Sequence, residues 1–72
     1  MSEDKEDLIV LNAKKDFVFD DFESAIKKLD LVLSKFEASP SKNNYILLKA
    51  ICKYKLGKYE DALKELDVLE KD

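Results

Sequence analysis

The chain has no histidine and no tryptophan, and each of its basic residues is a lysine. Histidine is the commonest general base near neutral pH, so the most usual acid–base catalyst is missing. Phosphate loops and nucleophile elbows need several glycines at fixed spacings, whereas Gly57 is the only glycine. The neighbouring carboxylates Glu60 and Asp61 fall in the first turn of a predicted helix, where the helix dipole explains them. The sequence therefore predicts a protein that is not an enzyme and has no cofactor.

The sequence also excludes an internal disulfide and a paired-cysteine metal site, and it argues against a membrane span. Cys52 is the only cysteine, and it lies in an apolar helical stretch where a thiol usually packs as a small core residue. The longest purely apolar run has four residues, far short of the roughly 20 that cross a bilayer. The acidic start, MSEDKED, lacks the apolar segment of a secretory signal. We therefore expect a cytoplasmic protein with no membrane span and no bound metal.

The charge is negative overall but unevenly distributed. A net charge of −3 argues against nonspecific nucleic-acid binding, which needs clustered cations. Eight lysines and two acids give residues 25–58 a charge of +6, while the segments before and after them carry −5 and −4. A basic middle segment can attract an acidic peptide. The alternative is a solvated surface whose opposite charges attract each other within the fold.

What the sequence does contain is helix-forming residues in a chain of 72, which is enough for one small domain. Charged residues make up 40% of it, and Pro40 joins Gly57 as the only strong turn formers. This composition predicts an all-α fold.

Two apolar stripes at helical spacing share one pattern. The first includes Phe22, Ala25, Ile26, Leu29 and Val32, and the second is Tyr59, Ala62, Leu63, Leu66 and Leu69. Each member of the second stripe lies 37 positions after its counterpart in the first. The match continues upstream, where Ala13 pairs with Ala50 and Phe17 with Tyr54. Such an internal repeat predicts two similar structural units.

Each unit is expected to be a helix, a tight turn and a second helix. The predicted helices cover about residues 4–19, 21–37, 42–56 and 59–71. Asp20 and Asp21 form the first turn, because aspartate tolerates left-handed backbone angles and can cap the next helix. Gly57 takes the left-handed position in the second turn. Pro40 ends the second helix. Residues 1–72 thus form one domain, with repeat 1 at about 4–37, a linker at 38–42 and repeat 2 at about 43–71.

The second unit resembles a tetratricopeptide repeat (TPR). That family's pattern is a small residue, an aromatic, Leu-Gly, an aromatic and an alanine, here Ala50, Tyr54, Leu56-Gly57, Tyr59 and Ala62. The first unit departs from it, with Asp20 for the glycine and Phe19 for the leucine. The 37-residue period also exceeds the usual repeat of about 34. The stretch from Cys52 to Tyr59 is similar to the TPR-like cytosolic domain of the mitochondrial fission adaptor family, although the chain lacks that family's C-terminal membrane anchor.

The resemblance implies four antiparallel helices in two hairpins, stacked with a right-handed offset. It also implies that the first helix of each unit lines a groove for a partner segment. The residues at matching positions are Val10, Lys14, Phe17, Leu47, Ile51 and Tyr54. For Phe17 and Leu47, packing between the units is the alternative. The clamp that holds C-terminal carboxylates in many relatives is not assembled, since its positions hold Val10, Lys14 and Leu48.

The C-terminal side of the predicted stack is expected to have an uncovered edge. We expect the last helix to bury Tyr59, Ala62, Leu63 and Leu66. The exposed edge should then carry Leu48, Leu56 and Leu69, where a second copy, a partner chain or downstream helices can bind.

Taken together, these patterns predict a protein–protein interaction module, a short TPR-like adaptor or scaffold that holds a peptide or a partner helix. The alternative is a self-assembling structural domain, including a homodimer through the C-terminal edge. A further alternative is the N-terminal part of a longer helical-repeat subunit of a multiprotein complex.

Overall fold

Four α-helices make up the fold of residues 5–70, the part of the chain that the computed structural model describes. They are α1 (Glu6–Val18), α2 (Phe22–Lys35), α3 (Lys42–Lys55) and α4 (Tyr59–Glu70). Residues 5–70 contain no strand, so the prediction of an all-α fold is confirmed. The observed helix ends agree with the predicted ones to within two residues. The predicted ends at residues 4 and 71 lie outside the described residues.

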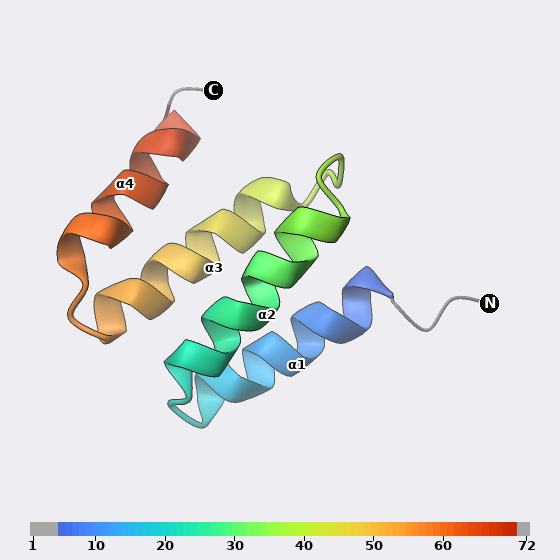
Figure 1. Cartoon of the computed structure of the whole chain (residues 1–72), viewed down its shortest axis with the longest axis horizontal. Coiled ribbons are helices and arrows are strands. Elements are labelled where there is room, and N and C mark those ends of the chain that lie inside the picture. Colours follow the sequence, from blue (N-terminus) through green and yellow to red (C-terminus); the bar gives the residue numbers. More distant parts are fainter. Residues whose placement is uncertain (1–4, 71–72) are drawn as a thin grey trace.

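The helices form an open array. Successive helices run in opposite directions and lie beside one another in chain order (Figure 1). α1 packs on α2, α2 on α3 and α3 on α4. The array is flat, with extents of 39 × 31 × 14 Å. Because α1 and α4 lie at opposite edges, the four helices do not close into a bundle (Figure 1). The right-handed sense of the stack stays a prediction.

The two hairpin turns end α1 and α3 with the same hydrogen bonds. The amide of Asp21 donates to the carbonyl of Asp16 at 2.8 Å, and the amide of Lys58 donates to the carbonyl of Lys53 at 2.9 Å. Each bond spans five residues, as in the Schellman motif that satisfies the last carbonyls of a helix. The four residues are 37 positions apart in pairs, so the internal repeat extends to the backbone of the turns.

Both turns need a residue with a left-handed backbone. Asp20 has a φ of 65° and Gly57 a φ of 84°, which confirms the conformation predicted for each. Residues with a side chain rarely adopt this left-handed backbone conformation, whereas glycine does so without a steric cost. Asp21 then caps α2, because its carboxylate accepts a hydrogen bond from the amide of Ser24 at 3.4 Å.

The core lies among α1, α2 and α3. Its largest fully buried side chains are Leu29, Val32 and Cys52. Each helix also buries one alanine, and these four are Ala13, Ala25, Ala50 and Ala62. α4 contributes only Ala62 to the buried residues. The first hairpin is therefore covered on more sides than the second.

A polar cluster holds the start of α1 against the second unit. The carboxylate of Glu6 accepts hydrogen bonds from the hydroxyls of Ser39, in the connection between the units, and Tyr45, in α3. The oxygen of Ser39 also accepts from the amide of Ser41 at 3.1 Å. The bonds from Ser39 and Tyr45 lower the pKa of Glu6, since they stabilise its charged form. The connection thus contributes directly to the contact between the two units.

Candidate functional site

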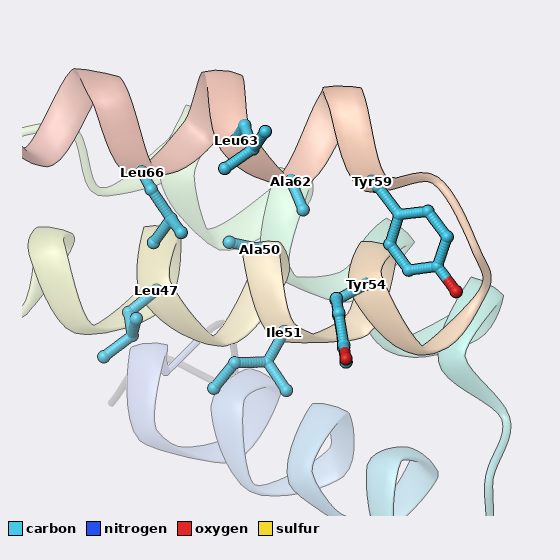
Figure 2. A pocket seen from close by; sticks show the side chains of 8 residues that line it. All are labelled: Leu47, Ala50, Ile51, Tyr54, Tyr59, Ala62, Leu63 and Leu66. Atoms are coloured by element: carbon cyan, nitrogen blue, oxygen red, sulfur yellow. The ribbon is translucent and has the colours of Figure 1, made fainter.

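An apolar groove runs between α3 and α4 (Figure 2). We call it the α3/α4 groove, and its volume is about 460 Å³. Its walls are formed by Leu47, Ala50, Ile51 and Tyr54 of α3 and by Tyr59, Ala62, Leu63 and Leu66 of α4. Apart from the two tyrosine hydroxyls, the side chains that line it carry no polar group.

The α3/α4 groove leaves large side chains open to solvent. The exposed fraction is 61% for Leu63, 60% for Tyr54 and 58% for Tyr59, and Leu47 and Ile51 are also exposed. The rings of Tyr54 and Tyr59 meet edge to face, with centroids 5.3 Å apart, beside the turn that joins the two helices (Figure 2). A contiguous apolar surface of this kind on a soluble protein usually marks a contact site.

A second groove, between α1 and α3, is more polar. Its volume is about 440 Å³. We call it the α1/α3 groove, and it is lined by Asp7, Val10, Leu11, Lys14, Ser41, Asn44, Tyr45 and Leu48. Because Asp7 and Lys14 have opposite charges, this groove does not favour a ligand of either sign.

The six residues predicted to face one groove do not lie together. Val10 and Lys14 line the α1/α3 groove, whereas Leu47, Ile51 and Tyr54 line the α3/α4 groove. Both grooves border α3, so this helix has two accessible sides where the sequence predicted one.

Phe17, the sixth of these residues, lines neither groove. It is half-buried and packs against the core. Its ring meets that of Phe22 edge to face, at 5.3 Å between centroids. This is the arrangement that Tyr54 and Tyr59 repeat in the second unit. Phe17 therefore packs within the fold, the alternative that the sequence left open for it.

The sequence prediction placed no residue of α4 in the groove. Tyr59 and Leu63 were expected to be buried, and the exposure of both shows that this expectation is wrong, although Ala62 is buried and Leu66 partly buried as expected. The internal repeat did contain a signal for the groove residues of α4 that the sequence prediction omitted. Subtracting 37 from each wall residue gives a residue of the first unit, and most of these contribute to the core.

The predicted exposed edge also lies elsewhere. Leu48, Leu56 and Leu69 are all half-buried. Leu69 follows Ala62 by seven residues, so it belongs to the stripe of α4 that faces inward. Leu48 packs on the core beside α1, and Leu56 lies near Ile26 of α2. Apart from Val68, the exposed large apolar and aromatic side chains of the second unit lie on the adjacent stripe of α4 and the facing side of α3.

Charged groups line the opposite side of α3. The ammonium of Lys53 lies 2.7 Å from a carboxylate oxygen of Glu65, and that of Lys49 lies 3.3 Å from the same atom and 2.5 Å from a carboxylate oxygen of Asp30. Burial acts to raise the pKa of Glu65, but the bond from Lys53 and the charges of both lysines outweigh it and hold this pKa below its ordinary value. Lys49 thereby links α3 to both α2 and α4.

The described residues show no chemistry that points to a reaction. Cys52 is fully buried, and burial raises the pKa of its thiol, which disfavours the reactive thiolate. Residues 5–70 hold no cluster of three or more groups that could bind a metal ion. Within the same part of the chain, no helix has the length and apolar character needed to cross a membrane.

Comparisons of the chain with protein-family models, with curated proteins and with solved structures found no match.

Proposed function

We propose that this chain is a protein–protein interaction module, a small adaptor whose α3/α4 groove binds an amphipathic helix of another protein. A TPR-like arrangement is part of the proposal, and the repeated hairpins and turns support it. A reducing compartment such as the cytoplasm suits the single, buried cysteine.

One observation carries this proposal: the groove is the second copy of a surface that already holds a helix. The counterparts of its walls in the first unit are Val10, Ala13, Lys14, Phe17, Phe22, Ala25, Ile26 and Leu29. Seven of these eight belong to the core or pack against it, and Tyr45, Leu48 and Cys52 of α3 pack on the same core. The equivalent surface of α3 and α4 has apolar or aromatic side chains at all eight of these positions and no covering helix within residues 5–70.

The proposal can be tested with a displayed library of helical peptides selected against the full chain. Selected peptides should bind the chain and should shift the amide and methyl resonances of Leu47, Ile51 and Leu63. Leu63→Lys should weaken binding at least about tenfold, because a charge in the middle of an apolar contact must be desolvated. Its side chain is mostly exposed, so the fold should remain intact by circular dichroism.

Leu8→Lys is the matched control. Leu8 is also a largely exposed leucine, but it lies on α1, away from the groove. Peptide binding should be unchanged in this variant. A library that yields no binder, or binders that both variants weaken equally, would show that the groove does not bind helices.

A second candidate function is self-assembly, and one specific feature favours it. α1 and the turn after it expose Leu8, Leu11, Val18 and Phe19, so further apolar side chains are accessible at the opposite edge of the array. If α1 of one copy occupies the groove of another, the mass from sedimentation equilibrium should rise with concentration. Both Leu8→Lys and Leu63→Lys should then return the chain to a monomer.

A further inference from the structure

α3 covers the surface of the first unit, so the residues of α3 indicate which chemistry suits the equivalent, uncovered α3/α4 groove. α3 meets the first unit through Tyr45, Leu48 and Cys52, which follow one another at steps of three and four residues. Cys52, at the C-terminal end of this stripe, is fully buried. Lys49 stands beside Leu48 and pairs with Asp30 of α2 at 2.5 Å. The contact is therefore an apolar stripe that ends in a small buried residue and has a lysine at its edge.

The acidic partner of that lysine is repeated in the second unit. Asp67 lies 37 residues after Asp30, and the two are identical residues in equivalent places on α2 and α4. Asp67 is exposed and follows Leu63 of the groove wall by one helical turn. Glu60 and Glu70 are also exposed acids, and they lie about one helical turn before Leu63 and one helical turn after Asp67. Lys64 is also exposed on α4, but the three acids leave this rim with a net negative charge, which favours a cationic edge on the bound helix.

We infer that the occupant is a partner helix with the pattern of α3, and that its lysine pairs with Asp67. In this pattern two large apolar residues are three positions apart, the lysine comes directly after the second, and a small apolar residue comes four positions after the second. The inference rests on the proposed function of the groove and adds to it the register and charge of the helix that binds.

α1 of a second copy matches this pattern less well. Leu8 and Leu11 have the correct spacing, but Asn12 stands where α3 has Lys49, and Lys15 stands where α3 has the fully buried Cys52. A second copy would bring a lysine to the position of the fully buried Cys52, where desolvation of its charge opposes binding. It would also leave Asp67 without its cation.

The sharpest probe is the α3 sequence itself, as a capped and fluorescently labelled peptide of residues 41–56. Binding to the full chain is measured by fluorescence anisotropy in reducing buffer. We expect the peptide to bind and Lys49→Glu in the peptide to weaken binding by about threefold to tenfold, the range for reversing a partly exposed ion pair. Asp67→Lys in the chain should weaken the parent peptide similarly and should restore the Lys49→Glu peptide. A peptide with Cys52→Lys, which imitates α1, should bind least.

Glu23→Lys in the chain is the control, because Glu23 is an exposed acid of α2 that does not line the α3/α4 groove. It should leave peptide binding unchanged. The inference is overturned if the charge reversal at Asp67 fails to restore the Lys49→Glu peptide, if Glu23→Lys weakens binding as much as Asp67→Lys, or if the α3 peptide fails to bind. The proposed function survives each of these results as long as selected library peptides still bind and Leu63→Lys still weakens them. A monomer–oligomer equilibrium that both Leu8→Lys and Leu63→Lys abolish would instead identify a second copy as the occupant.

Discussion

Lys53 and Glu65 form an ion pair of 2.7 Å across the α3–α4 hairpin, and its counterpart in the first unit has the charges reversed. Subtracting 37 from each number gives Asp16 and Lys28, which are paired across the α1–α2 hairpin. The two ion pairs lie at equivalent positions, but the acid is on the first helix in one hairpin and on the second helix in the other. What the repeat requires at this point is opposite charge between the two helices of a hairpin, whichever helix carries the acid.

Charge reversal in the first unit tests this requirement. Asp16→Lys should lower the free energy of unfolding by about 1–3 kcal/mol, because it places a cation in a largely buried position beside Lys28. The double variant Asp16→Lys/Lys28→Asp should return close to the parent in urea denaturation, since it restores the arrangement of the second unit. A double variant no more stable than the single one would mean that the order of the two signs matters.

The same reversal in the second unit should recover less. Lys53→Asp/Glu65→Lys restores one pair, but Lys49 then faces a lysine in place of the carboxylate that it contacts at 3.3 Å. The first unit has Asn12 at the position of Lys49. Adding Lys49→Asn should therefore improve the double variant, and urea midpoints of the three chains measure the difference.

The pKa of Glu65 predicts a loss of stability in acid. Its pKa is lowered in the folded chain, so the unfolded chain takes up the proton first, near the ordinary value of about 4.3. The stabilisation is present above that pH and is lost as the pH falls through the lower folded pKa. Glu65→Gln should make the urea midpoint less dependent on pH below about pH 4.3. A Glu65→Gln chain with the same pH dependence as the parent would contradict this prediction.

The buried alanines should respond differently to enlargement. Ala25 has no exposed surface and lies in the covered first unit, so Ala25→Leu should lower the free energy of unfolding by about 1–3 kcal/mol. Ala62→Leu should have a smaller effect, because Ala62 lies on the wall of the open α3/α4 groove, into which a larger side chain can extend. Thermal melts of both variants measure the difference. Equal losses would show that the groove is too narrow to accommodate the leucine.

Substitutions at the two left-handed turn positions should change the free energy of unfolding in opposite directions. Gly57→Ala should cost about 1–2 kcal/mol, because a side chain there strains the backbone, while the space around the added carbon is open. Asp20→Gly should raise the stability by about 0.5 kcal/mol, since it removes that strain from the first turn. Chemical denaturation of both variants provides the test. A stabilising Gly57→Ala would contradict the left-handed assignment.

Local interactions explain what the sequence by itself determined. The periods of the apolar stripes specify four helices, and Gly57 and Asp20 specify the turns, because turn conformation depends on the backbone freedom of single residues. The 37-residue repeat paired equivalent residues, among them the alanines that the four helices bury. Each of these features depends on residues close together in the chain or on the comparison of one unit with the other.

The tertiary structure decided which side of each helix is covered. Tyr59 and Leu63 have the same helical spacing as Phe22 and Ile26, yet α3 covers the first unit and no helix among residues 5–70 covers the second. Equivalent sequence therefore produces core in one unit and an open groove in the other. The comparison of the two units did not predict the ion pair of Lys53 with Glu65, because the equivalent residues, Asp16 and Lys28, carry the opposite charges. Burial and pairing depend on which neighbour packs against a helix, and only the packed array determines that neighbour.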